Sequence, residues 1–280
     1  MKVVRTQEEL KQVRAHYTNE TIGFVPTMGG LHEGHLSLIR RSLSECDCTF
    51  VSVFLNPTQF NNPTDLQTYP HNDEDDLHLL ESAGVDVVFM PTPEAVYEPN
   101  ECPPQYDLGH VAEVMEGQYR PGHFQGVVWI VSKLFRLVRP TYAYFGLKDF
   151  QQIAVIARMV ELSPDIDVKI VPCPVVREPD GLAMSSRNNR LTPAERAVAP
   201  LIYKALLAGK ELKESGASVS EVREAVVRMI EKEPLLRVEY FSIVDGTTLE
   251  ELREWGESRE PVGAITVYCG EVRLIDHVAL

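Results

Sequence analysis

Two histidines stand three residues apart beside a pair of glycines in the segment PTMGGLHEGHLSL, residues 26–38. Imidazole rings can hold a metal ion, transfer a proton or donate hydrogen bonds to an anion. The segment follows the apolar run 22–25 and leads into a helical pattern from about Gly34. A strand that enters a glycine-rich turn and then a helix is a frequent phosphate site, because exposed backbone N–H groups and the helix dipole favour anions. We therefore expect His32 and His35 to line a phosphate group.

Two other interpretations of this histidine pair stay open, a metal site and a purely structural role. The stretch HEGH lacks the HExxH spacing that puts two histidines on one helical face, and the sequence identifies no set of metal ligands. It also lacks the P-loop lysine and the GxGxxG pattern of dinucleotide-binding folds. Thr27, Met28 and the two histidines are instead similar to the HxGH signature of the nucleotidyltransferase superfamily, in which both imidazoles stabilise charge at the ATP phosphates.

A second polar segment, GLAMSSRNNR at residues 181–190, stands where that superfamily carries its KMSKS-like loop. Met184, Ser185, Ser186 and Arg187 offer backbone N–H groups, two hydroxyls and a guanidinium, which suit a departing pyrophosphate. The alternative is a polar linker between two domains. The presence of both signatures in one chain favours a phosphate-binding role for this loop.

The strands and helices of the chain must bring the histidine segment and the serine-arginine segment together. Over the first two-thirds of the chain, apolar runs typical of strands alternate with helical patterns. This rhythm is typical of βαβ units and a mostly parallel sheet. We expect an α/β fold with a Rossmann-like, doubly wound domain at 1–176 and a smaller α+β domain at 177–280. Expected strands cover 22–25, 49–55, 85–90, 142–145 and 168–176, then 238–244, 264–269 and 272–275. Expected helices begin near 34, 73 and 149, cover 111–116, 124–137, 193–214 and 219–231, and include a short one near 249.

Composition restricts the possible partners and the compartment. A chain of 280 residues with 44% hydrophobic and 24% charged residues is typical of a globular protein. The net charge of -14 argues against a nucleic-acid partner, since such proteins carry a basic face. No apolar run approaches the ~18 residues of a membrane helix, and the N-terminus reads as a strand and an amphipathic helix without a secretory signal. Five scattered cysteines favour free thiols, and we expect a cytoplasmic protein.

Five motifs occur in one order along the chain: PTMGGLHEGHLSL, FLNPTQF, RPGHFQGV, FGLKDFQQ and DGLAMSSRN. Together they resemble the pantoate:β-alanine ligase family, and the resemblance covers nearly the whole chain. It implies an ATP-dependent enzyme that uses Mg²⁺. Pantoate attacks ATP to give pantoyl adenylate and pyrophosphate, and the amine of β-alanine then displaces AMP. The resemblance also implies a homodimer formed through the N-terminal domain.

The resemblance assigns roles to particular residues. His32, His35, Lys148, Ser185, Ser186 and Arg187 would be catalytic, Gln59 and Gln152 would bind pantoate through neutral amides, and Asp149 would hold the ribose. The implied nucleotide-binding residues are Met28, Gly29, Gly30, Leu31, His32, Glu33, Gly34, His35, Gly146, Leu147, Lys148, Asp149, Val176, Met184, Ser185, Ser186 and Arg187. The chain departs from the family at Leu147, where glutamate is common, and at His71, where arginine is common.

Two groups of charged residues have no clear assignment. The acids Asp73–Asp76 are interpreted as favourable partners of a helix dipole, although Asp75 and Asp76 would also suit Mg²⁺. Arg120 and His123 of the RPGHF motif fit catalysis and loop anchoring equally well, so we do not count them as catalytic.

Three other functions compete with the ligase. A simple adenylyltransferase that acts on a phosphate such as phosphopantetheine would share HxGH, but it would not explain the two glutamine motifs or the C-terminal domain. A tRNA synthetase-like or RNA-binding protein would need a basic surface, which the net charge argues against. A non-catalytic dimerisation module would not need polar loops at both ends of a sheet.

Overall fold

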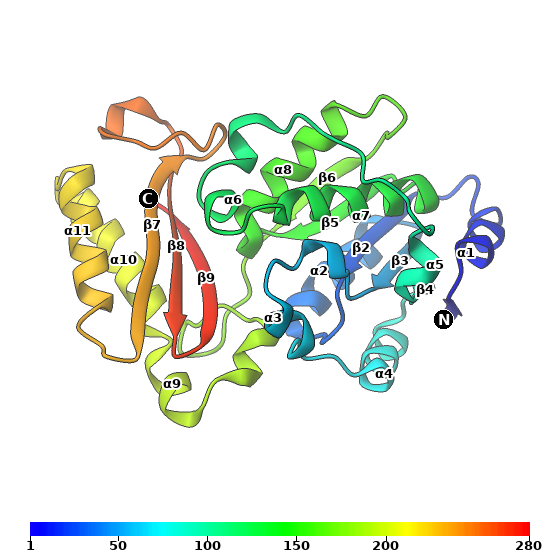
Figure 1. The fold of residues 1–280 in the computed structure, drawn as a ribbon, viewed down its shortest axis with the longest axis horizontal. Helices are drawn as coiled ribbons and strands as arrows, with labels where there is room; N and C mark the ends of the chain where they lie inside the picture. The colour runs from blue at the N-terminus through cyan, green and yellow to red at the C-terminus, as the bar shows by residue number, and fades with distance from the viewer.

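Six parallel strands form the main sheet of the computed structural model, which describes residues 1–280 (Figure 1). Their order is β1-β4-β3-β2-β5-β6: the chain begins with β1 at one edge, crosses to the centre with β2, builds back towards that edge through β3 and β4, and then builds the other half with β5 and β6. The direction of winding therefore reverses between β2 and β5, and ligands of doubly wound sheets bind at this point. The strands are β1 (Lys2–Val4), β2 (Ile22–Thr27), β3 (Cys48–Val53), β4 (Val87–Phe89), β5 (Tyr142–Gly146) and β6 (Lys169–Cys173).

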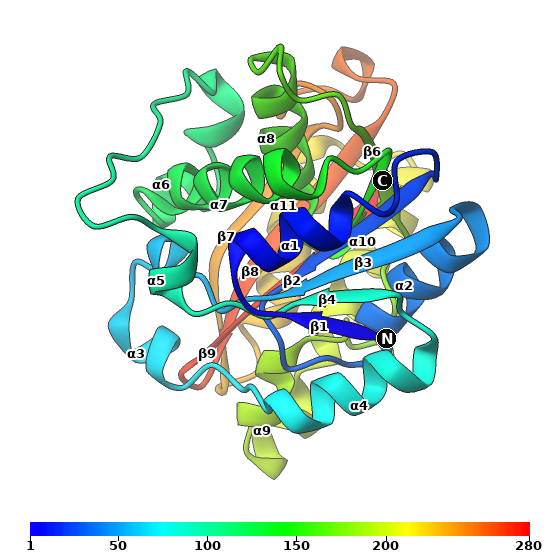
Figure 2. The ribbon, with the colours of Figure 1, turned by 90° about the vertical axis from the view of Figure 1, so that its right-hand side faces the viewer.

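Helices cover both faces of this sheet, as Figure 2 shows. One face carries α1 (Gln7–Arg14), α7 (His123–Val138) and α8 (Phe150–Glu161). The opposite face carries α2 (Glu33–Glu45) and α4 (Asp73–Ala83). Because side chains alternate along a strand, Phe24 of β2 packs in the first layer and Val25 in the second. The short helices of this part are α3 (Pro63–Gln67), α5 (Pro93–Val96) and α6 (Glu116–Tyr119).

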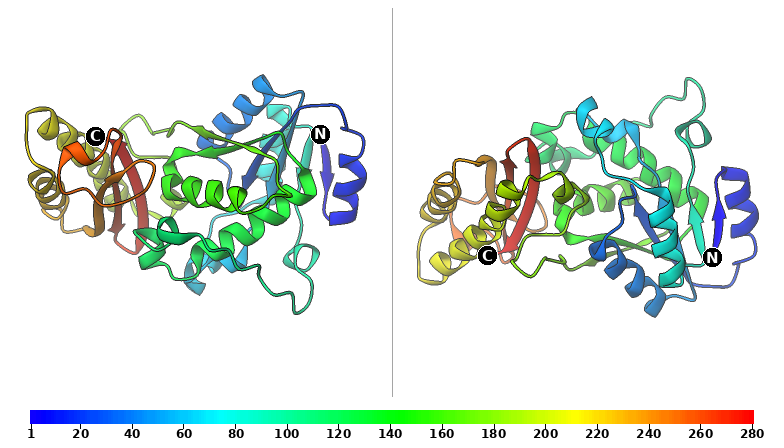
Figure 3. Two further views of the ribbon diagram at one scale, coloured as in Figure 1. Left: turned by 90° about the horizontal axis from the view of Figure 1, so that it is seen from above. Right: turned by 90° about the horizontal axis from the view of Figure 1, so that it is seen from below.

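A smaller antiparallel sheet, in the order β7-β8-β9, forms the C-terminal part (Figure 3). Its outer face packs against helices α10 and α11 around a core of its own. Its inner face meets the N-terminal part, where Val244 and Val262 pack with Met115 and Phe150. The elements are α9 (Pro193–Val198), α10 (Leu201–Glu214), α11 (Val219–Ile230), β7 (Leu236–Asp245), β8 (Pro261–Cys269) and β9 (Val272–Ala279). The expected α/β class, with a doubly wound sheet and a smaller α+β part, is confirmed.

The helix expected at 111–116 is absent as a single element. A 3₁₀ turn covers Gly109–Ala112 and α6 begins at Glu116, because Met115 between them has φ +44° and ψ −117°. The Gln151 amide holds this break: it donates to the carbonyls of residues 111 and 114 and accepts from the N–H of Glu116. A tertiary contact thus overrides local helical preference.

Two further expectations at the C-terminal end were wrong in detail. The helix expected at 193–214 is divided into α9 and α10 near Pro200, which has no N–H to donate to an uninterrupted helix. The short helix expected near Leu249 is a turn in which Leu249 has φ +62° and the Asp245 carboxylate accepts from two backbone N–H groups. A 3₁₀ turn at Trp255–Glu257 follows instead.

Candidate active site

A cavity of about 190 Å³ opens at the carboxyl ends of β2 and β5, on either side of the point where the winding reverses. Met28 follows β2 into the cavity wall, and Gly146, Lys148 and Asp149 continue the wall from β5. The serine-arginine loop, residues 184–187, forms a further side of the same cavity. Most of the expected nucleotide-binding residues line it, namely Met28, His32, Gly34, His35, Gly146, Lys148, Asp149, Val176, Met184, Ser185, Ser186 and Arg187.

The remaining expected residues lie outside this cavity wall. Gly29, Gly30 and Leu31 form the turn behind it, and Leu147 does not line it. Glu33 is exposed on α2 and pairs with Arg40 of the same helix.

The glycine-rich turn between β2 and α2 depends on its two glycines. Gly29 and Gly30 have φ values of +82° and +62°, which only glycine adopts readily. A Cβ atom on Gly30 would also lie 2.4 Å from the carbonyl oxygen of Pro70. The turn therefore packs closely against the segment before α4.

Asp76 of α4 holds the same turn and was missed as a site residue. Its carboxylate accepts from the N–H groups of Gly30 and Leu31 at 2.9 and 2.8 Å, and the residue is only 2% exposed. Burial raises the pKa of Asp76, against the lowering effect of these two bonds. The available signal was helical spacing, because Asp76 precedes the buried Leu80 by one turn while the acids Asp73 and Asp75 are exposed.

We expect Asp76→Asn to lower the free energy of unfolding by about 2 kcal/mol, because the new NH₂ group would face a backbone N–H donor. The rate of the pantoate-dependent pyrophosphate exchange that the family resemblance implies should fall about tenfold, since the turn supports both histidines. Urea unfolding and the exchange assay measure the two effects. Asp73→Asn, in the exposed position of the same helical turn, is the control, and equal behaviour of the two variants would contradict the anchoring role.

The two histidines are held by backbone N–H groups. Gly34 N–H donates to Nδ1 of His32 at 3.1 Å, and His32 N–H donates to Nδ1 of His35 at 3.3 Å. The ring centroids are 4.2 Å apart. With Nδ1 accepting, each neutral ring carries its hydrogen on Nε2, which makes no hydrogen bond to the protein. Each ring is thus prepared to donate an N–H to an anion.

Burial keeps both rings neutral. Burial and then the nearby Lys148 lower the pKa of His32 to about 4. Burial, followed by the effects of His32 and Lys148, lowers the pKa of His35 to about 3. At neutral pH the pair therefore offers N–H dipoles rather than positive charge.

The serine-arginine loop docks directly on the histidine turn. The Ser186 hydroxyl donates to the carbonyl oxygen of Gly30 at 2.9 Å, across 156 residues of sequence. Arg187 donates to both oxygens of Asp65 in α3, at 3.2 and 2.8 Å, and Arg190 donates to the same carboxylate at 2.7 Å. The two signatures that the sequence separates thus meet at one cavity.

The two expected pantoate glutamines, Gln59 and Gln152, also line this cavity. Gln59 is 8% exposed; its amide donates to the sulfur of Met28 and accepts from Asn56. The Gln152 side chain makes no hydrogen bond within the protein, whereas its neighbour Gln151 is fully used in holding the break at Met115. Of these two adjacent glutamines, Gln152 thus faces the cavity and Gln151 has a structural role.

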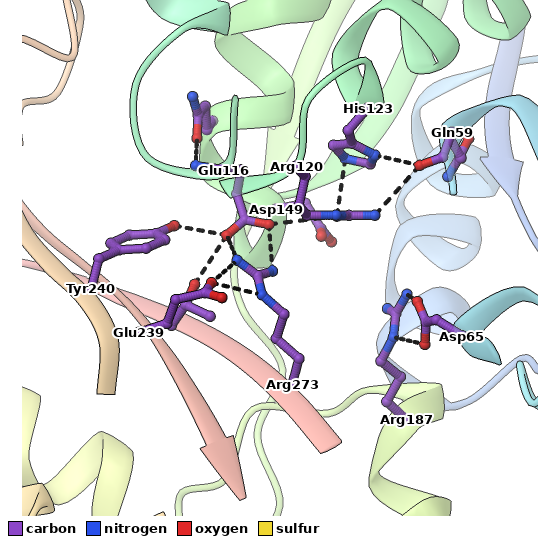
Figure 4. A network of polar contacts seen from close by, with 12 residues as sticks. Gln59, Asp65, Glu116, Arg120, His123, Asp149, Arg187, Glu239, Tyr240 and Arg273 are labelled. Atoms are coloured by element: carbon purple, nitrogen blue, oxygen red, sulfur yellow. Dashed lines mark hydrogen bonds and ion pairs between the residues drawn. The ribbon is translucent and has the colours of Figure 1, made fainter. Parts of the chain in front are cut away.

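Arg120 and His123 lie beside Gln59, as Figure 4 shows. His123 Nδ1 donates to the carbonyl oxygen of Gln59 at 2.7 Å, which leaves Nε2 to accept from Arg120 at 3.2 Å. Burial and then the Arg120 charge lower the pKa of His123 to about 4. This geometry supports loop anchoring by His123.

The depressed pKa of His123 predicts a loss of stability in mild acid. The unfolded chain binds the proton near pH 6.5 and the folded chain only near 4, so the contribution is complete above pH 6.5 and is lost as the pH falls towards 4. When the pH is lowered from 7 to 4.5, the neutral burial of His123 should reduce the free energy of unfolding by about 2 kcal/mol. Urea unfolding should therefore depend less steeply on pH in His123→Gln than in the wild type. The exposed His16→Gln is the control, and equal slopes in all three proteins would contradict the prediction.

No cluster of three or more His, Cys, Asp or Glu side chains is arranged to hold a metal ion. Mg²⁺ is commonly bound by one or two carboxylates together with substrate phosphates. Asp149 lines the cavity, and Asp75 lines a neighbouring one that His32 and Ser185 also line. These side chains fit a magnesium ion that arrives with a nucleotide.

A doubly wound parallel sheet, with an HxGH turn and an MSSR loop meeting where its winding reverses, defines a nucleotide-binding α/β enzyme of the HxGH nucleotidyltransferase superfamily. The family model for pantoate-beta-alanine ligase matches residues 2–279, and the chain belongs to this family. It is an ATP-dependent ligase that condenses pantoate and β-alanine to pantothenate through pantoyl adenylate, with release of AMP and pyrophosphate. The family and activity expected from the sequence are confirmed.

Relatives and solved structures agree over the full length. The chain is 52% identical to pantothenate synthetase of Porphyromonas gingivalis over 284 residues, which cover 99% of each protein. It is 45% identical to pantothenate synthetase of Thermosipho africanus, with both chains fully covered. The crystal structure of pantothenate synthetase from Thermus thermophilus has a TM-score of 0.93 at 43% identity, and 99% of each chain is covered.

A further solved structure carries ligands. It is pantoate-beta-alanine ligase of Francisella tularensis in complex with beta-gamma ATP and beta-alanine. The TM-score is 0.83 at 34% identity, covering 100% of this chain and 97% of the other.

In the present protein, no helix combines the length and apolar character required to span a bilayer.

Proposed function

We propose that the cavity at the ends of β2 and β5 is where the ligase forms pantoyl adenylate. The observation that carries this proposal is the meeting of the histidine turn, the serine-arginine loop and both glutamines at one cavity. A pantoate carboxylate oxygen attacks the α-phosphorus of ATP, a new P–O bond forms, and pyrophosphate leaves with the electron pair of the broken P–O bond.

His32 and His35 stabilise the charge on the phosphates by donating Nε2–H. A neutral donor of this kind, aimed in advance at developing charge, is effective in a site that excludes water. Lys148 adds a mobile positive charge, and Ser185, Ser186 and Arg187 bind the departing pyrophosphate. Mg²⁺ bound to ATP would neutralise part of the phosphate charge.

Gln59 and Gln152 hold pantoate, and Asp149 and the backbone of Val176 contact the ribose and the adenine. Neutral amides orient the pantoate carboxylate without a full positive charge that would reduce its nucleophilicity. The wall is open at Gly146, where a Cβ atom would meet no neighbouring atom, so the nucleotide can approach the end of β5. Gly29, Gly30 and Leu31 contribute through the shape of the turn that carries both histidines, and the expected roles of Glu33 and Leu147 at the nucleotide stay predictions from the family resemblance.

The proposed domain division falls at residue 177, with residues 1–176 binding nucleotide and pantoate and residues 177–280 acting as a lid. This division is supported by the end of β6 at Cys173 and by the separate core of the C-terminal sheet.

We also propose a homodimer formed through the N-terminal domain, from family resemblance. A cytoplasmic location is supported by five free cysteines, since disulfides are rare there.

The test of the site is to measure ATP consumption with pantoate, with and without β-alanine, in the wild type and in Gln152→Ala. Pantoate alone should drive pyrophosphate exchange into ATP, and β-alanine should be required for sustained AMP release. The Gln152 variant should raise KM for pantoate about tenfold or more while KM for ATP changes little. An unchanged KM for pantoate would remove Gln152 from the site.

Analytical sedimentation of the purified protein tests the proposed homodimer, and cell fractionation tests the proposed cytoplasmic location.

A further inference from the structure

A second cavity, of about 370 Å³, lies between the N-terminal and C-terminal parts. It adjoins the first, because Lys148, Asp149, Ser185 and Arg187 line both. The side chains proposed above to act in adenylation all line the first cavity. The second substrate, β-alanine, must then reach the acyl carbon from a side that the adenylate leaves open, and the adjoining cavity provides such a side.

Most charged groups in this second cavity already have close partners. Arg273 of β9 donates to both oxygens of Glu116 at 2.6 and 2.7 Å and also to Glu239 of β7. Arg187 and Arg190 share Asp65. These guanidiniums are therefore compensated within the protein.

Arg120 is the exception among the guanidiniums of this cavity. Its side chain is 17% exposed, yet its contacts are long: 3.5 Å to Glu116, 3.5 Å to the carbonyl oxygen of Gln59 and 3.2 Å to His123. A guanidinium has five N–H donors, and leaving them poorly bonded in a buried place is unfavourable. The arrangement is suited to an anion that completes the hydrogen bonds.

The position of Arg120 connects the two cavities. It lines the second cavity and reaches the backbone of Gln59, a residue of the first. Figure 4 shows it between Glu116 and Gln59. A small molecule with a carboxylate at Arg120 could thus extend its other end towards the pantoate side of the first cavity.

We propose that Arg120 binds the carboxylate of β-alanine in the second cavity and so directs its amine to the pantoyl adenylate. A planar guanidinium is well matched to a carboxylate. The neutral amine forms the new C–N bond to the acyl carbon, the C–O bond to AMP breaks, AMP leaves with that electron pair, and one amine proton is released to water. This proposal rests on the ligase function and adds the residue that selects its amino-acid substrate.

The test removes the positive charge from the enzyme and the negative charge from the substrate in combination. The amines are β-alanine and β-alaninamide, an analogue of similar shape in which a neutral amide replaces the carboxylate, and the enzymes are the wild type and Arg120→Gln. The wild type should prefer β-alanine in kcat/KM, and the variant should lose about 100-fold with β-alanine but little with β-alaninamide. Intrinsic differences between the two amines cancel, because only the ratio between enzymes is compared. Arg120→Lys should recover part of the preference.

Two controls keep this result specific. Pantoate-dependent pyrophosphate exchange, which needs no β-alanine, should remain within about threefold of the wild type in Arg120→Gln. Arg190→Gln, which removes a guanidinium from the same cavity, should keep the wild-type preference for β-alanine. An equal loss with both amines, a collapse of the exchange reaction, or a loss of preference in the Arg190 variant would overturn the proposal. Failure of the wild type to make pantothenate would instead contradict the ligase function itself.

Discussion

Replacing His35 with alanine should lower the rate of pantoate-dependent pyrophosphate exchange by about 10³-fold, because a donor to the phosphate charge is lost in a buried site. The loss should fall mainly on kcat, since the bond strengthens as charge develops in the transition state. Folding should be affected much less, and urea unfolding measures this separately. Rapid-quench measurement of adenylate formation gives the chemical step directly.

His35→Gln separates hydrogen bonding from proton donation. A glutamine amide can place an N–H near the position of Nε2 but cannot act as an acid, so it should recover about tenfold over alanine if the role is hydrogen bonding. The low pKa of His35, which follows first from burial, supports this role over donation of a full proton. The exposed His78→Ala should retain wild-type activity. Near-normal exchange in His35→Ala would remove this residue from the mechanism.

Replacing Glu116 with glutamine should lower the free energy of unfolding by about 3 kcal/mol, because Arg273 would keep a buried charge with only part of its compensation. Glu116 also accepts from Tyr240 and Thr266, so together with Arg273 one carboxylate joins α6 to all three strands of the C-terminal sheet. Burial alone would raise its pKa, but Arg273 and Arg120 lower it to about 2. The stabilisation is therefore complete above about pH 4.5 and is lost as the pH falls towards 2.

The partner of Glu116 supplies the check on this interpretation. Glu116→Gln and Arg273→Met should each be strongly destabilising, whereas the double variant should cost less than the sum of the two, because it removes both charges. Urea unfolding of the four proteins at pH 7 gives the coupling energy. Glu113→Gln, an exposed neighbour, should change stability by less than about 0.5 kcal/mol. Additive effects would show that the pair is not coupled.

Local patterns were sufficient for the elements around the cavity. The apolar run at 22–25, the glycines after it and the helical pattern from Gly34 predicted β2, the turn and α2, since strand and helix periods are properties of short segments. The same reasoning failed at Met115 and Leu249. At Met115 the contacts from Gln151 determine the backbone, and contacts between residues so far apart in sequence have no signal in the local pattern. At Leu249 the signal was local, because the Asp245 carboxylate accepts from the N–H groups of the next two threonines and so favours a turn over a helix.

Residue types and spacing within short segments were enough to predict the class of fold and a phosphate site at the histidine turn, and the resemblance of five motifs predicted the family. Which side chains meet depended on tertiary packing. The fold bonded Ser186 to Gly30, assigned Asp76 to the glycine turn, and left Arg120 with unfilled donors between two cavities. It also separated the role of Gln152 from that of Gln151. Such contacts join residues far apart in the chain, and they form only when helices and sheets pack around a shared core.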